Sequence, residues 1–263
     1  VRVSLGLHAQ YEKELDYSPY RSISNMPLVA ASSEGVYVYE GSTRDHLRRF
    51  GHDGLYQKTI YPFPASKIKK VIGLIWGKAP DGHEVVVKET GWHNTLLTSG
   101  INSTYKYKNG CASTVLAVNG KRIALAYLFL NRISSDGTSG DFPLKGSKLP
   151  GIDITFLSET DHHGGQAGDG KKKVGPGSMA FSPDGKVVYL TGYMWEVGGP
   201  AGGESNQSVF KLNYETNEEV SVFAGINSKT GYGSDDTHFS VPTSVDTDMK
   251  GNVYVSDYLN DRI

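Results

Sequence analysis

The chain has 263 residues, 38% apolar and 21% charged, with 27 basic side chains against 28 acidic ones and a single cysteine. This composition is that of an ordinary globular protein and excludes a collagenous, mainly disordered or disulfide-stapled chain. No apolar run approaches the ~18 residues that a membrane-spanning helix needs, so we expect no membrane span. A net charge of -1 gives no broad basic surface for a phosphate backbone, so we expect no nucleic-acid partner.

The glycine and aromatic content indicates the type of secondary structure. The chain contains 32 Gly, 11 Pro, 16 Tyr, 9 Phe and 3 Trp. Glycine and proline favour turns, and aromatic side chains favour strands. We therefore predict an all-β fold of short strands joined by tight turns.

One sequence unit recurs five times: an apolar strand, a turn with glycine, and a strand that alternates Val or Ile with Tyr or a small residue. Each copy predicts a β-hairpin. In chain order the copies are Pro27–Tyr39, Ile72–Val87, Thr114–Leu125, Met179–Leu190 and Thr243–Val255.

The spacing of the five copies was measured between their turn glycines, Gly35, Gly82, Gly120, Gly185 and Gly251. The first two intervals lie near the roughly 40–50 residues of a four-stranded propeller blade. The last two are longer by about twenty residues, in Gly- and Ser-rich stretches that are typical of insertions into blades.

Further strands follow two of the hairpins. His46–Phe50 and Tyr56–Tyr61 are predicted as the third and fourth strands after the first copy. Ser208–Tyr214 and Glu219–Phe223 are predicted to do the same after the fourth copy. Both units therefore read as four-stranded meanders.

The last copy carries the most specific pattern. Phe239–Ile263 contains, in order, a Pro before the inner strand, an Asp at its end, Gly-Asn before Val-Tyr-Val, another Asp, and Asn-Asp-Arg-Ile. This stretch closely resembles an NHL repeat, and Ser182–Gly185 resembles the equivalent turn of related propeller repeats. The resemblance implies a β-propeller of four-stranded blades, the fold that the repeat spacing also predicts.

We expect one propeller domain over residues 1–263, with blades at about 24–65, 68–110, 112–158 and 176–224 and a partial blade at 239–263. The family that the chain resembles typically has six or more blades, and the sequence stops inside a repeat. We therefore expect a fragment of such a propeller, or an incomplete one. The alternative is that Val1–Leu7 completes the last blade as a clasp.

Alternation along the second strands of the hairpins predicts how the sheets pack. In Val36–Tyr39 and Val253–Val255, successive side chains point to opposite faces of the strand. Because Tyr alternates with Val instead of Lys or Glu, we expect both faces to be covered by neighbouring blades.

Long segments are predicted to gather at one end of the strands. Strand direction alternates within a blade, so the turns after the first and third strands lie at one end. The connections from the second to the third strand and from one blade to the next lie at the other end. Long loops on a rigid scaffold commonly carry binding or catalysis, although insertions without any contact role are the alternative. The five segments are the Trp92–His93 loop, Asn131–Pro150, Glu159–Val174, Thr191–Gln207 and Ala224–Ser240.

The densest polar cluster on this end is a candidate metal site. Asp161, His162 and His163 offer oxygen and nitrogen ligands suited to zinc or another transition ion, within a Gly-rich stretch. Adjacent His side chains on an extended strand point apart, so a solvated loop is the alternative.

Asp235, Asp236 and His238 form a second polar group on the same end and are candidate ligand-binding residues. Their carboxylates offer oxygen ligands for calcium, although the loop lacks the alternating acids and terminal Glu of an EF-hand. In NHL-type sequences this stretch is also a Gly-rich connector between blades, which is the alternative interpretation.

Aromatic side chains supply the third candidate. Trp92, His93, Tyr193 and Trp195 stand on loops where flat rings can stack on a sugar or anchor a protein partner. The alternative is that these rings pack on the blade below their loop.

Two functions follow from these features. The first is a binding scaffold of the NHL-like propeller type that holds a protein or carbohydrate ligand across its loop-rich end. The second is a metal-assisted hydrolase or lyase for a lactone, carbohydrate or amide-type substrate, because similar propellers include lactone hydrolases and an amidating lyase with central metal sites. Acids at inner-strand positions, Asp246 and Asp248, occur in one copy only. The resemblance also implies an extracellular or periplasmic location.

Overall fold

A computed structural model describes residues 27–40, 46–87, 115–126, 130–144, 178–191, 207–216, 221–226 and 232–263. In these residues the regular structure is β-sheet, apart from single 3-10 turns at Ile68–Lys70 and Tyr258–Asn260. The all-β prediction is therefore confirmed. No helix in this part of the chain is long and apolar enough to cross a membrane.

Five antiparallel sheets are present among the described residues, two of them four-stranded, one three-stranded and two two-stranded. Their strands are, sheet by sheet, β1 (Leu28–Ser32), β2 (Gly35–Glu40), β3 (His46–Phe50) and β4 (Tyr56–Tyr61); β5 (Ile75–Lys78) and β6 (Glu84–Val87); β7 (Val115–Asn119), β8 (Arg122–Ala126) and β9 (Leu130–Ser134); β10 (Ser178–Phe181), β11 (Val187–Thr191), β12 (Gln207–Asn213) and β13 (Ser221–Ile226); and β14 (Pro242–Thr247) and β15 (Val253–Asp257).

Each of the five repeated units forms the predicted hairpin. The pairs β1–β2, β5–β6, β7–β8, β10–β11 and β14–β15 are antiparallel and directly connected. β3 and β4 have the predicted bounds, β12 lies within one residue of its predicted bounds and β13 within three. The two four-stranded meanders are therefore confirmed.

The turn glycines have backbone conformations that other residues rarely adopt. All five have positive φ, and Gly35 has the most extreme value, +139°. A Cβ atom at Gly35 would lie 2.3 Å from the carbonyl oxygen of Phe50 on β3. Glycine is therefore required here by both its φ angle and the close approach of β3.

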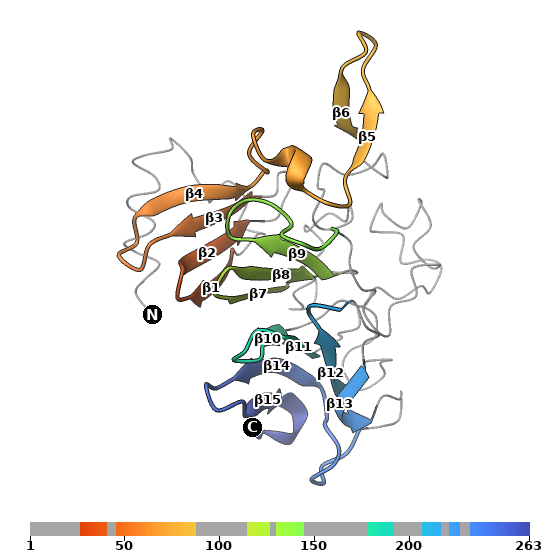
Figure 1. The fold of residues 1–263 in the computed structure, drawn as a ribbon. Coiled ribbons are helices and arrows are strands. Elements are labelled where there is room, and N and C mark those ends of the chain that lie inside the picture. Colours follow the sequence, from red (N-terminus) through yellow and green to blue (C-terminus); the bar gives the residue numbers. More distant parts are fainter. Residues whose placement is uncertain are drawn as a thin grey trace.

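The first strands of four sheets lie next to one another. β1 packs beside β7, β7 beside β10, and β10 beside β14, while each first strand forms an edge of its own sheet. Figure 1 shows these sheets in succession, from the orange strands through green to blue. The four first strands consequently line a common centre.

The second repeat lies outside this succession, which the sequence did not indicate. β1 packs directly beside β7, so none of the described sheets separates the first repeat from the third. The β5–β6 hairpin instead projects away from the other sheets (Figure 1). Within the described residues, the second copy is thus a hairpin of the predicted kind in a different position.

The expected loop at Asn131–Pro150 is wrong in its first part. Residues 130–134 form β9, which pairs with β8 from Arg122 to Ala126. Asn131 and Arg132 lie in this strand and are buried. Both faces of β9 are covered, so its sequence shows no alternation of apolar and polar residues. The strand was therefore not recognisable from the sequence.

Apolar clusters fill the spaces between successive sheets. Tyr37 and Tyr39 of β2 pack with Ile123 and Leu125 of β8 between the first and third sheets. A second cluster lies between the third and fourth sheets and includes Phe210. A third cluster lies between the fourth and fifth sheets and includes Val245.

Cover by a neighbouring sheet, as the alternation predicted, is found for one face of β2 and only partly for β15. Tyr37 and Tyr39 face the cluster shared with the third sheet, whereas Val36 and Val38 pack with Phe50 and Tyr56 of their own sheet. On β15, Val255 packs inward, whereas Tyr254 remains 48% exposed.

A buried arginine joins the third and fourth sheets. Arg132 donates from Nε to the carbonyl oxygen of Tyr214 at 2.6 Å, and its guanidinium lies over the rings of Phe142 and Tyr214. The Tyr214 hydroxyl donates to the carbonyl of Ile123 at 3.2 Å. Burial lowers the pKa of Arg132 and raises the pKa of Tyr214.

Candidate functional site

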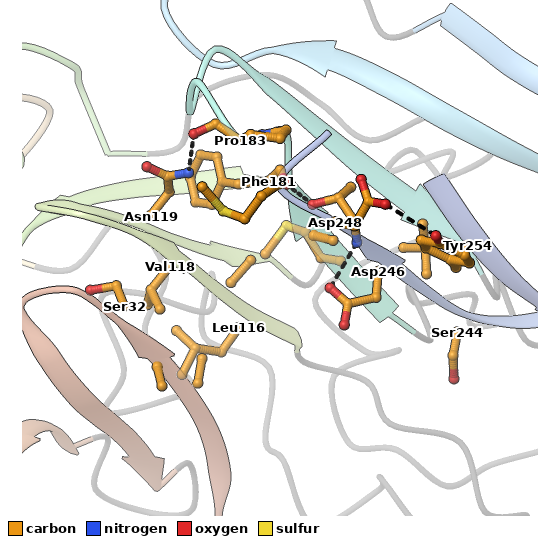
Figure 2. A pocket seen from close by; sticks show the side chains of 18 of the residues that line it. Ser32, Leu116, Val118, Asn119, Phe181, Pro183, Ser244, Asp246, Asp248 and Tyr254 are labelled. Carbon is orange, nitrogen blue, oxygen red and sulfur yellow. Dashed lines mark hydrogen bonds between the residues drawn. The ribbon is translucent and has the colours of Figure 1, made fainter. Parts of the chain in front are cut away.

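A cavity of about 910 Å³ lies where the four first strands meet. It is lined by residues of β1, β7, β10 and β14, by the turns that follow these strands, and by Tyr254, Ser256 and Ile263, and Figure 2 shows it from close by. Lining residues used below are Val29, Ala31, Leu116, Val118, Met179, Ser244, Asp246, Asp248 and Tyr254.

One side of the cavity is apolar. Leu116 and Val118 line the cavity from β7 and also pack against the cluster between the first and third sheets, while Val115 and Ala117 belong to the cluster between the third and fourth sheets. Val29 on β1 adds an aliphatic side chain that is 59% exposed. This side therefore presents hydrocarbon surface that a ligand could cover.

The other side carries carboxylates and a hydroxyl. Figure 2 shows Asp246 and Ser244 of β14 across the open space from Leu116 and Val118. Asp246 is exposed, and its Oδ1 accepts a hydrogen bond of 2.8 Å from the amide of Thr247, which orients the carboxylate.

Asp248 lines the same side but has a structural role in its turn. Its carboxylate accepts hydrogen bonds from the side chain of Asn252 at 2.7 Å, the hydroxyl of Tyr254 at 3.1 Å and two backbone amides. The bond from the Asn252 side chain is the main reason that the pKa of Asp248 lies below its usual value. Asp246 is therefore the carboxylate with more freedom to meet a ligand.

Hydrogen bonds between sheets hold the rim of the cavity. Ser32 donates to the carbonyl of Gly120 at 3.0 Å, and Asn119 donates to the carbonyls of Ser182 and Pro183 at 3.0 and 3.1 Å. Thr247 donates to the carbonyl of Phe181 at 2.5 Å. Each bond joins the end of one first strand to its neighbour, so the strand separation is fixed by polar contacts.

The residues that resemble an NHL repeat form a second polar network, at the other end of β14. The Asp257 carboxylate is 1% exposed and accepts bonds from the Ser240 amide at 2.6 Å, Asn260 at 2.7 Å and Arg262 at 2.8 Å. Arg262 also donates to the carbonyls of Ser234, Asp235 and His238. The network ties the 232–240 connection to β15.

Asp235 and His238 lie together within this connection. The His238 Nδ1 atom lies 2.7 Å from each Asp235 carboxylate oxygen, and Thr237 donates to Asp235 from its amide and hydroxyl. The His238 contact, followed by the Thr237 bonds, lowers the pKa of Asp235. Asp236 is exposed. The first two side chains shape the loop, and Asp236 faces solvent.

The remaining candidates lie outside the described residues. They are Trp92, His93, Asp161, His162, His163, Tyr193 and Trp195. Among the residues that the structure does describe, no group of three or more His, Cys, Asp or Glu side chains is placed to hold a metal ion.

Most of the cavity was not predicted from the sequence, because the predicted candidates stand on long loops whereas strand residues line most of the cavity. Leu116, Val118 and Val29 belong to the first strands, where alternate residues point to opposite sides. That alternation, read together with the order of the sheets, was the available signal. Asp246 and Asp248 were noticed as inner-strand acids but had no partner until the fold was known.

No protein-family model matches the sequence, and no curated protein matches it significantly. Among solved structures, the chain is similar to a structural-genomics protein of unknown function from Bacteroides thetaiotaomicron, with 15% sequence identity and a TM-score of 0.37. The match covers 88% of this chain and 52% of the other, so the chain spans about half the length of that structure.

Proposed function

We propose that this chain is a non-catalytic binding scaffold of the β-propeller type, whose ligand enters the cavity between β1, β7, β10 and β14. The observation that supports this function is the meeting of four first strands around about 910 Å³ of open space. This volume lies within the roughly 300–1,000 Å³ of typical small-molecule sites. The rigid rim supports binding because the wall needs little reordering.

The propeller assignment within this proposal rests on the arrangement of the sheets. Sheets that meet through their first strands and pack face to face are the building plan of propeller blades. The network of Asp257, Asn260 and Arg262 supports an NHL-type blade, because it uses the residues that define the sequence resemblance.

A second surface of the scaffold is proposed at the opposite end of β14. There the 232–240 connection is held by Arg262 and presents Asp236 and Tyr232 to solvent. A rigid loop of this kind suits a protein or carbohydrate partner. Because the propellers that the sequence resembles are often exported, we also propose an extracellular or periplasmic location.

The cavity proposal is tested by mapping where small molecules bind. A chemically mixed ligand collection is screened by thermal shift, and each hit is mapped by hydrogen exchange. We expect at least one hit to protect residues 29–33, 116–120 or 244–248 and to raise stability in proportion to its concentration. Hits that protect only other segments, or no hits, would overturn the proposal.

A further inference from the structure

The two sides of the cavity differ in chemistry. Leu116 and Val118 line one side, and Asp246 and Ser244 lie opposite (Figure 2). Val29 of β1, the strand beside β7, adds hydrocarbon to the lining. No lysine or arginine lines the cavity among the described residues. The charged side chains in the described lining, Asp246 and Asp248, are therefore both acidic, and both belong to the β14–β15 hairpin.

From this asymmetry we infer that the cavity selects an amphiphilic organic cation, with an apolar body against Leu116 and Val118 and an ammonium or guanidinium group at Asp246. This inference rests on the proposed function and specifies its ligand class. Charge complementarity carries the inference, because a cation placed here meets a carboxylate and, among the described lining residues, no positive side chain.

The position of Asp246 suits a hydrogen-bonded ion pair. The amide of Thr247 occupies Oδ1, and no hydrogen bond from a described residue is found at Oδ2. Bonds between charged donors and carboxylates are roughly twice as strong as neutral ones. Ser244, two residues earlier on β14, adds a hydroxyl to the cavity lining.

An apolar ligand body would gain contact area on the facing side. Val29 is exposed, and Leu116 and Val118 are only partly buried, so a hydrocarbon chain would remove their surface from water. Each buried methylene group contributes about 0.8 kcal/mol, equivalent to roughly a fourfold gain in affinity. A short hydrophilic cation would lack this gain.

The test uses octylammonium with octanoate and 1-octanol as probes of equal chain length, each titrated by calorimetry into the whole chain. We expect octylammonium to bind at least about tenfold more tightly than octanoate. Asp246→Asn should remove this preference while leaving 1-octanol binding unchanged. The asparagine oxygen can still accept the Thr247 amide, so the fold is retained.

Two further variants separate the cavity from general surface effects. Asp53→Asn removes the same charge from the exposed turn between β3 and β4, which does not line the cavity, and should change no affinity. Val29→Ser should weaken octylammonium and 1-octanol alike. Equal binding of octanoate and octylammonium, an unchanged preference in Asp246→Asn, or no octylammonium binding would overturn the inference. If neutral or anionic ligands alone protect the cavity in hydrogen exchange, the scaffold proposal survives and this inference fails.

Discussion

Buried polar side chains fix the ends of the strands in this protein. Asp257 shows this most clearly, because its two carboxylate oxygens receive bonds from the chain before β14 and the chain after β15. Asp257, Asn260 and Arg262 stand out in the sequence through a resemblance to a repeat pattern, which says nothing about their contacts. The contacts explain why the three residues occur together: they close one structural unit.

Replacing Asp257 by Asn tests the strength of this network. The substituted amide would place an NH2 group against the donors of Arg262 and Asn260, leaving them unsatisfied in a site that is almost fully buried. We expect the free energy of unfolding to fall by about 2–4 kcal/mol, below the full cost of a fully buried pair because Arg262 is partly exposed. Urea denaturation at pH 7 measures the change.

Asp261→Asn is the matched control, since it removes the same charge from an exposed residue. Asp261 has a φ of 50°, a conformation that asparagine tolerates. The free energy of unfolding of this variant should remain within about 0.5 kcal/mol of that of the original chain. Equal losses in both variants would show that net charge, and not the Asp257 network, determines the effect.

At the level of strands, local sequence patterns predicted most of what forms. Turn glycines followed by alternating Val and Tyr gave the hairpins, because both signals depend on neighbouring residues alone. β9 was not predicted, because its polar residues are stabilised by residues that are distant in sequence. Asn131 and Arg132 are tolerated inside it through contacts with residues far along the chain, such as the bond from Arg132 to Tyr214.

Gly35 and Gly120 offer a comparison of two hairpin turns. Ala at Gly35 meets the Phe50 carbonyl and a φ of +139°, whereas Ala at Gly120 meets a φ of +53° with no atom within 4 Å. We expect a loss of about 3 kcal/mol or more for Gly35→Ala and about 1–2 kcal/mol for Gly120→Ala. Thermal unfolding of both variants checks the order, and a larger loss at Gly120 would contradict it.

For the whole molecule, the sequence predicted the number of hairpins but not how they are arranged. The position of the β5–β6 hairpin, and hence the contact of β1 with β7, depends on packing between distant segments. The same limit applies to the candidate site. Asp246 could be picked out from one strand, but Leu116 faces it only because four sheets converge.

Hydrogen exchange should reveal this arrangement directly. Amides of β5 and β6 belong to a two-stranded unit outside the succession of sheets, whereas β8 is a central strand whose residues from Ile123 to Ala126 are fully buried. Isolated hairpins are marginally stable, so we expect β5–β6 amides to exchange at least about a hundredfold faster than those of β8. Comparable protection in the two elements would mean that the hairpin is packed as firmly as the sheets.

The rim bonds of Ser32, Asn119 and Thr247 also bear on how such a protein could evolve. These side chains hold the frame, while Val29, Leu116 and Asp246 occupy other positions on the same strands. Substitutions at the latter positions can therefore alter chemical preference without moving the backbone. Descendants of one ancestral chain could acquire unrelated ligands while keeping an identical spacing between their strands.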